Sequence, residues 1–338
     1  MSTGHDDPNR PWWGMAAAAT QCEGAAPRAD WAGWEAEGRA PASHDGNGFR
    51  TRYADDLALL AEHGVTHHRL TVEWGRLEPH PGRWDGDEVD HLRRVLAAGR
   101  DAGIEMWACL LHGSAPGWFT DDERGWLGDQ AVLTWARHVD RVAESLGDLV
   151  AGWVPVHEPE VLARLGYGDG TFPPGRHDPA DHRNARAGLL AAEAEAARLL
   201  RTGPAPVAVT ARQEALHADQ DLLVVNTAME RLDVSLEQAA DSAPGARLVI
   251  VTGDPEGGGG APRPGDADDE RREERLRRAV RTVADAGAAG VTILGAFVQP
   301  AIDGYEWHQG FDARLGLFDR DRNPRRALAA LPVTRSDA

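Results

Sequence analysis

The regular alternation of short apolar runs with longer amphipathic segments is the feature that most constrains this chain of 338 residues. Such alternation is typical of repeated strand and helix units, and not of a sandwich or a helix bundle. The apolar runs predict strands at Trp12–Thr20, His67–Trp74, Glu105–Leu111, Gly152–Val156, Pro206–Ala211, Asp221–Asn226, Arg247–Thr252 and Val291–Val298. The segments between them predict helices at Tyr53–His63, Asp87–Ala102, Asp129–Leu146, Asp181–Arg201, Met229–Ala240 and Asp269–Ala286.

This pattern predicts the α/β class, and eight strands suit a closed parallel (β/α)8 TIM barrel. Barrels of about 250 residues and more are routinely single domains, so the length does not require two. We expect a flexible N-terminus over residues 1–11, a barrel over residues 12–332 and a short tail over residues 333–338.

Two regions are harder to interpret. The stretch Arg212–Ala246 fits either a strand at Asp221–Asn226 followed by a helix, or one long helix. Adjacent valines and the need for an eighth strand favour the strand. The Gly-, Pro- and Asp-rich segment Asp254–Asp269 predicts a mobile loop at the mouth of the barrel, because it cannot carry a core.

The charge limits the classes of partner. Arginine supplies all the cationic side chains, 36 against 54 acidic residues, and the net charge of −18 argues against nucleic acid, polyphosphates and anionic membrane surfaces. A neutral substrate is therefore expected. The first ten residues are polar and acidic, unlike a secretory signal, and no window has the length of a membrane helix, so we predict a cytoplasmic protein.

Polar side chains follow the apolar runs at several places. Because the carboxyl ends of parallel strands open on one face of a barrel, these side chains are expected to meet there. They are Gln21 with Glu23, Arg69 with Trp74, His112, His157 with Glu158, Asp254, and Glu306 with Trp307. Carboxylates and amides bind hydroxyl groups while an indole covers the apolar face of a sugar ring, so the set suits a sugar ligand.

Glu158 is the strongest candidate for a catalytic residue. It ends the apolar run Trp153–Val156 and is followed by Pro159, which stops the strand. A carboxylate delivered there is a candidate proton donor, and it needs a second group that attacks or activates water.

Several spaced segments resemble glycoside hydrolase family 1, a family of β-glucosidase-like (β/α)8 barrels. The resemblance covers most of the chain, and its combined motifs are more specific than any one of them. The segments are Gly14–Ala25, His68–Leu77, Leu110–His112 with Pro116, Val156–Pro159, Leu165–Gly168 with Pro174–Gly175, Asp303–Trp307 and Arg314–Leu317.

The resemblance implies roles for the matching residues. Gln21 and His112 would bind sugar hydroxyls, and Arg69 would support the nucleophile. Glu158 would be the general acid/base, and Glu306 with Trp307 would hold the non-reducing sugar.

The chain also departs from that family. It is shorter, which implies a shallower substrate pocket. His157 replaces an Asn that contacts the sugar 2-hydroxyl, and Gly113 and Gln299 each replace a Trp. Gly253 falls where the nucleophilic Glu is expected, within Val251–Glu256.

These departures leave several outcomes open. Asp254 or Glu256 could serve as a displaced nucleophile or as a base for water, because removing a Glu side chain makes room for water between two carboxyl groups. His157 could act as a proton carrier, since the ordinary histidine pKa near 6.5 suits that work. A site without a nucleophile could accept an external anion, or the chain could be a sugar-binding protein without turnover.

Other motifs favour ordinary structural roles. His67 and His68 are expected to be strand and core histidines, because Gly64 breaks any helical pairing with His63, and no metal site is supported. The glycines of Gly257–Gly260 lack the Lys and Ser/Thr of a phosphate-binding loop, so we expect no nucleotide and no other cofactor. The sequence does not determine the oligomeric state.

Overall fold

A computed structural model describes residues 11–210, 221–253 and 266–332. Its strands form one closed parallel barrel in the order of the sequence, from β1 to β8. They are β1 Trp12–Ala16, β2 His67–Thr71, β3 Glu105–Cys109, β4 Gly152–Val154, β5 Val207–Thr210, β6 Asp221–Ala228, β7 Arg247–Gly253 and β8 Thr292–Gln299. The predicted (β/α)8 barrel is confirmed.

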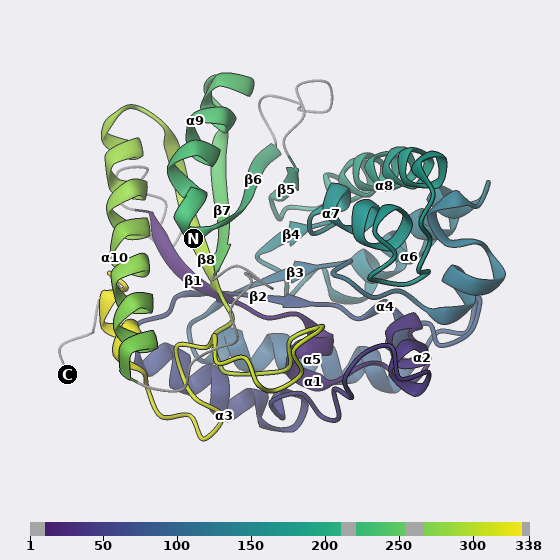
Figure 1. Ribbon diagram of the computed structural model, residues 1–338, viewed down its shortest axis with the longest axis horizontal. Coiled ribbons are helices and arrows are strands. Elements are labelled where there is room, and N and C mark those ends of the chain that lie inside the picture. Colours follow the sequence, from purple (N-terminus) through teal and green to yellow (C-terminus); the bar gives the residue numbers. More distant parts are fainter. Residues whose placement is uncertain (1–10, 211–220, 254–265, 333–338) are drawn as a thin grey trace.

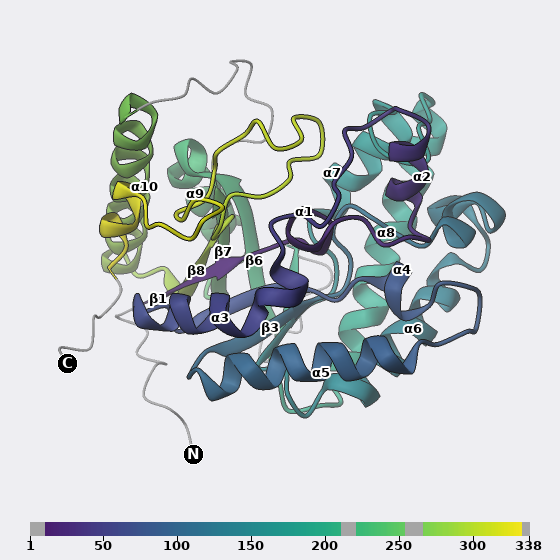
Figure 2. The same ribbon diagram turned by 90° about the horizontal axis from the view of Figure 1, so that it is seen from below.

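Helices surround the barrel. They are α1 Ala19–Glu23, α2 Asp30–Ala36, α3 Phe49–Glu62, α4 Trp74–Leu77, α5 Gly86–Asp101, α6 Ala131–Leu146, α7 Pro159–Ala163, α8 Pro179–Leu200, α9 Leu232–Ser242 and α10 Asp266–Ala288. Figure 1 shows α9 and α10 on one side of the strands and α6 and α8 on the opposite side. Figure 2 shows α3 and α5 along a third side, and the yellow segment that follows β8 running toward α1.

Three apolar layers hold these elements together. Trp12, Trp107 and Phe297 lie in the cluster that fills the barrel interior, where alternate residues of each strand point inward. A larger cluster lies between the strands and the helices. A third, aromatic cluster includes Trp31 and Trp307 and packs segments that follow the strands. Because Trp12 stacks on His67 at 4.0 Å, the inward face of β2 carries His67 and then Arg69.

Most predicted boundaries are close, and the differences have local causes. The first predicted strand is too long: β1 ends at Ala16, and Ala19 begins α1, because alanines favour helix over strand. β2 likewise ends at Thr71, before α4. The long-helix alternative for Arg212–Ala246 is wrong, since Asp221–Ala228 pairs with β5 and β7.

Other predictions fall on segments that the structure does not describe. The loop predicted at Asp254–Asp269 falls largely outside the described residues, and α10 begins at Asp266, three residues earlier than expected. The predictions for residues 1–10 and 333–338 also lie outside them. Within the described ranges, no helix has the length and apolar character needed to cross a membrane.

Candidate active site

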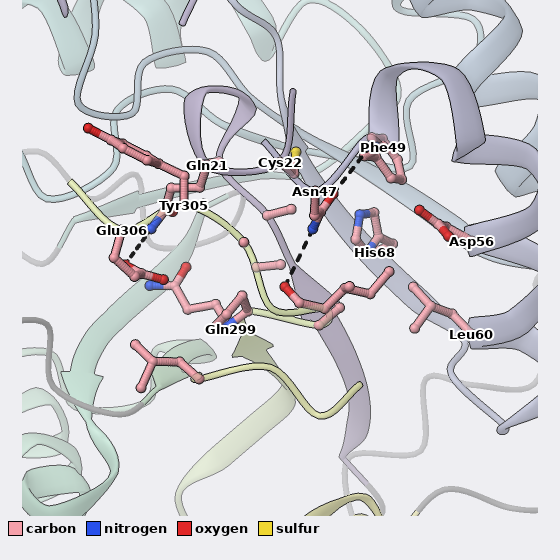
Figure 3. A pocket seen from close by; sticks show the side chains of 18 residues that line it. Gln21, Cys22, Asn47, Phe49, Asp56, Leu60, His68, Gln299, Tyr305 and Glu306 are labelled. Atoms are coloured by element: carbon pink, nitrogen blue, oxygen red, sulfur yellow. Dashed lines mark hydrogen bonds between the residues drawn. The ribbon is translucent and has the colours of Figure 1, made fainter. Parts of the chain in front are cut away.

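Two segments from opposite ends of the chain meet at the carboxyl end of the barrel. Gln21 lies in α1, just after β1, and Glu306 lies in the segment after β8. The Gln21 side-chain amide donates to Glu306 Oε2 at 2.7 Å, and the Tyr305 backbone N–H donates to the Gln21 carbonyl at 3.0 Å (Figure 3). Because β1 and β8 are hydrogen-bonded neighbours that close the barrel, their following segments are brought together. The predicted convergence of Gln21 and Glu306 is therefore seen.

Arg69 organises the floor of the site from β2. Its side chain is 0% exposed. It donates from Nη1 to His157 Nδ1 at 3.0 Å and from Nη2 to Gln299 Oε1 at 3.1 Å. A guanidinium group has only donors, so Nδ1 of His157 must accept and the neutral ring carries its proton on Nε2. Arg69 thus links the carboxyl ends of β4 and β8.

Two buried histidines lie side by side above Arg69. The rings of His112 and His157 are 4.0 Å apart. Burial lowers the pKa of His157 well below its ordinary value, and the neighbouring His112 and Arg69 lower it further. Burial followed by Arg69 likewise lowers the pKa of His112. Both rings are therefore neutral at neutral pH, and the ordinary pKa on which the proton-carrier hypothesis for His157 depends does not hold here.

Glu158 has an unusual backbone conformation. Its φ of 49° and ψ of 60° place it in the left-handed region, which is uncommon for a residue other than glycine. Pro159 begins α7 directly after it and fixes the turn. The Glu158 side chain is 34% exposed, and its Oε2 lies 3.8 Å from His157 Nε2. The turn therefore leaves the carboxyl group partly open to solvent beside His157.

The environment of Glu158 favours its protonated form. Burial raises the pKa of this carboxyl group, while Arg69 and Arg164 oppose the rise. Partial exposure and a raised pKa are both properties of a group that donates a proton to a bound molecule.

Trp307 is less open than expected for a surface on which a sugar lies. It is 4% exposed, packs edge to face against Trp31 at 4.6 Å, and lies against the tilted ring of Phe172 at 5.2 Å. Its ring also lies over Gly113. Its centroid is 6.5 Å from that of His112, so aromatic packing fixes it beside the site.

A small cavity lies behind Gln21 and Glu306 (Figure 3). Gln299 lines it as well, and it extends between β1 and α3 to His68 and Asp56. Its volume of about 30 Å³ suits roughly two water molecules. Glu158, His157 and Arg69 do not line this cavity, and the bond between Arg69 and Gln299 connects the two groups of side chains.

The remaining candidates lie elsewhere or outside the described residues. Glu23 turns toward Arg50 and Arg76, 3.5 and 3.8 Å away, in an ion-pair cluster of α1, α3 and α4. Trp74 is a core residue. Asp254 and Glu256 follow the last described residue of β7, Gly253, and lie outside the described ranges.

Gln299 was not among the residues expected to touch the ligand, although a polar residue that ends β8 carries the same signal as the others. His68 is a core histidine as predicted, 1% exposed. Among the residues that the structure describes, no group of three or more His, Cys, Asp or Glu side chains could hold a metal ion.

The barrel and this cluster of side chains define a protein of the (β/α)8 glycosidase class. The model of glycosyl hydrolase family 1 matches residues 7–216, and the chain belongs to that family. Among its relatives, Beta-glucosidase 38 of Oryza sativa subsp. japonica is 32% identical over 126 residues, which are 37% of this chain and 26% of that protein. The cytosolic beta-glucosidase of Homo sapiens is 27% identical over 183 residues, which are 48% of this chain and 37% of that protein.

Solved structures support the fold. A beta-glycosidase named BGL167 superimposes with a TM-score of 0.82 and 22% identity, covering 97% of both chains. The AHE enzyme from Alicyclobacillus herbarius gives a TM-score of 0.86 at 19% identity over 97% of both chains. A family 1 b-glucosidase from Thermotoga maritima, solved in complex with isofagomine lactam, gives 0.81 at 17% identity, covering 94% of this chain and 95% of that one.

Proposed function

We propose that this barrel binds a β-linked sugar or a glycosylated small molecule and hydrolyses it, with Glu158 as the general acid. One observation carries the proposal: Glu158 stands at the carboxyl end of β4 with a strained backbone, a side chain that is one-third exposed and a pKa raised by burial. Strain of this kind costs on the order of 1–3 kcal/mol and clusters at functional sites.

The binding part of the proposal is supported by polar groups at the same end of the barrel as Glu158. Glu306 and Gln21 present paired acceptors and donors for sugar hydroxyls, and the neutral His112 is a further hydrogen-bonding group. The Nε2–H of His157 can donate to a hydroxyl, as the Asn at this position does in the family that the sequence resembles. The T. maritima enzyme that shares this fold was solved in complex with isofagomine lactam, which supports a small molecule as the ligand.

The attack step is the part that departs from the usual pattern. We propose that Gly253 takes the position of the nucleophile, so that β7 itself supplies no carboxylate. A Cβ atom there would lie 2.5 Å from the Gln299 carbonyl oxygen, so the backbone at this position has no room for a side chain.

Water would then attack the anomeric carbon directly. Asp254 or Glu256 would take a proton from the water as the new C–O bond forms, and Glu158 would give its proton to the leaving oxygen as the glycosidic bond breaks. This route needs about 6.5–9.5 Å between the two carboxyl groups and inverts the configuration.

Turnover of aryl β-glycosides tests the proposal. Wild-type protein should release the phenol, and Glu158→Gln should abolish release from substrates with poor leaving groups while leaving activated ones partly active. The wild-type rate should fall as pH rises through the pKa of Glu158, because only the protonated form donates. Glu160→Gln, a change at an exposed residue two positions later, is the matched control. Wild-type turnover no faster than that of Glu158→Gln would remove the hydrolase proposal.

A second candidate function is sugar binding without turnover. The absence of a side chain at Gly253 favours it, because that position of β7 then supplies no carboxylate for the attack step. It predicts calorimetric binding of a monosaccharide that survives Glu158→Gln but is lost in Glu306→Ala, with no product in any assay. If no sugar binds to the wild-type protein, both candidate functions are wrong.

A further inference from the structure

Arg69 is a fully buried cation without a carboxylate partner. In the described part of the chain, no acidic oxygen lies within ion-pair distance of its guanidinium group, and its Nε has no hydrogen-bond acceptor. Arg322 shows the contrast, because its guanidinium group pairs with Asp56 through two bonds of 2.8 Å. Both hydrogen-bond partners of Arg69 are neutral, and Glu158 acts on it only as a charge beyond ion-pair distance. A buried charge of this kind is costly, and a counterion at contact distance would offset that cost.

The two partners of Arg69 are turned so that their donors face away from it. His157 uses Nδ1 as the acceptor and keeps its proton on Nε2, while Gln299 uses Oε1 as the acceptor and keeps its NH2 group. Gln299 is only partly buried, whereas His157 is 4% exposed and is reached only from the side of Glu158, whose side chain is 34% exposed. Arg69 therefore has a neutral side chain with a remaining N–H donor on each side of it, one after β4 and one at the end of β8.

We propose that this floor binds a carboxylate group, held by the Gln299 amide and His157 Nε2–H and neutralised by Arg69. The carboxylate belongs either to the sugar, as in a glycuronide, or to a small free acid. The proposal takes the position of the ligand from the proposed function and does not require turnover.

The net charge of −18 favours a neutral ligand. At this site, however, the charge of the buried Arg69 has more influence on the ligand than the distant surface charges. Exposed surface charges are screened over about 10 Å in salt, whereas a buried cation at contact distance is screened much less. Two acidic groups of the described residues lie near these donors: Glu306 lines the same cavity as Gln299 and accepts from the Gln21 amide at 2.7 Å, and Glu158 lies 3.8 Å from His157 Nε2. The raised pKa of Glu158 reduces the repulsion, because the protonated form carries no charge.

Binding without substrate turnover tests the inference. The full chain would be titrated by calorimetry and by thermal shift with formate, glucuronate and glucose at constant ionic strength, with chloride as the reference anion. We expect formate or glucuronate to raise the melting temperature in a concentration-dependent way that chloride does not reproduce. Glucuronate alone would place the carboxylate on the sugar, and formate as well would show that a free acid suffices.

Gln299→Glu is the decisive variant. It places an internal carboxylate where Oε1 now accepts from Arg69 at 3.1 Å, so it should weaken formate and glucuronate binding at least tenfold and raise the melting temperature of the unliganded protein. Gln238→Glu adds the same charge on the exposed face of α9 and should leave binding unchanged. If Gln299→Glu does not fold, Arg69→Gln, which keeps a donor for His157, should abolish the carboxylate effect.

Two results would overturn the inference: no carboxylate binds better than chloride, or binding is unchanged in whichever of these variants folds. Glucose binding without any carboxylate effect would support the proposed sugar site and contradict the anion site. Formate binding without any sugar binding would support the anion site and contradict the sugar site.

Discussion

At the scale of single residues, Gly113 shows how a missing side chain shapes the site. Its φ is +81°, and an added Cβ atom would lie 2.6 Å from Trp307 Cζ2 and 2.7 Å from Cη2. The family that the sequence resembles has a Trp at this position, so Trp307 now fills the space beside the backbone. Gly113 thus permits the position of Trp307 beside His112.

We predict that Gly113→Ala displaces Trp307 and weakens sugar binding about tenfold or more. The added methyl group cannot coexist with the indole, and a side chain at positive φ adds strain of about 1–2 kcal/mol. Gly103→Ala is the matched control, because its φ is +80° and nothing lies within 4 Å of the added atom.

Urea unfolding, tryptophan fluorescence and calorimetry would compare the two variants. Only Gly113→Ala should change the fluorescence and the affinity. Both variants should be less stable than the wild type, because both place a side chain at positive φ. Equal effects in both variants would show that Trp307 does not depend on Gly113.

The sequence predicts part of this site, for a physical reason. Gln21 and Glu306 were predicted to meet because the ends of parallel strands converge whatever the side chains are. The link from Arg69 to Gln299 was not predicted, since it depends on side-chain direction at two strand ends. The burial of Trp307 was not predicted either. It depends on aromatic packing among segments far apart in the sequence, and hydrophobic periodicity does not reveal such contacts.

At the scale of secondary-structure elements, a buried carboxylate joins α8 to β5. Glu193 is 5% exposed, and its Oε1 accepts from both the backbone N–H and the Oγ1 hydroxyl of Thr210, each at 2.8 Å. Burial is the main cause that raises the pKa of Glu193 to about 7, against an ordinary value of 4.5. The hydrogen bonds fix the end of a short strand whose next residues lie outside the described chain.

We predict that Glu193→Gln stabilises the protein at alkaline pH. Because the pKa is higher in the folded state, the stabilising contribution of this group is complete below pH 4.5 and is lost as pH rises through about 7. The amide oxygen can still accept both bonds, and it never ionises. The variant should therefore match the wild type near pH 4 and exceed it by up to about 3 kcal/mol at pH 8.

Chemical denaturation at a series of pH values measures this difference. Glu237→Gln, on the exposed surface of α9, is the control and should leave the pH dependence unchanged. A stability difference for Glu193→Gln that does not vary with pH would contradict the prediction.

The helices and strands were predicted well where the spacing of apolar residues and the length of the segment indicated the same kind of element. The strands pack on both faces, so they read as apolar runs, and long helices such as α6 and α8 show a clear helical period. Short elements such as α2 and α4 were missed, because a single turn or two carries too few residues for a period. Their apolar residues, including Trp31 and Trp74, pack as core and not as ligand contacts.

At the scale of the whole molecule, one ion pair fastens the segment after β8 to the helical shell. Arg322 lies in that segment, and Asp56 lies in α3; their side chains are 9% and 1% exposed. Arg322 also donates to the Asn47 carbonyl at 2.9 Å. Because the same segment carries Glu306, this anchor links the stability of the shell to the position of a proposed sugar-binding group.

We predict that Asp56→Asn destabilises the protein by about 3–5 kcal/mol, because it leaves the Arg322 charge buried without its partner. The exposed pair of Arg326 and Glu270, whose side chains are 60% and 61% exposed, is the control, and Glu270→Gln should cost less than about 1 kcal/mol. Urea unfolding measures both losses. Hydrogen exchange should show faster opening of residues 300–325 in Asp56→Asn, with weaker sugar binding.

A double-mutant cycle with Arg322→Gln separates two contributions to the loss of stability: the lost attraction between the two side chains, and the cost of leaving one buried charge without a partner. The double variant should be more stable than Asp56→Asn alone, because neither charge is then left unpaired. If Asp56→Asn costs no more than Glu270→Gln, the segment after β8 must be held by its other contacts, such as the bond from Tyr305 to Gln21, and α3 would not control the position of Glu306.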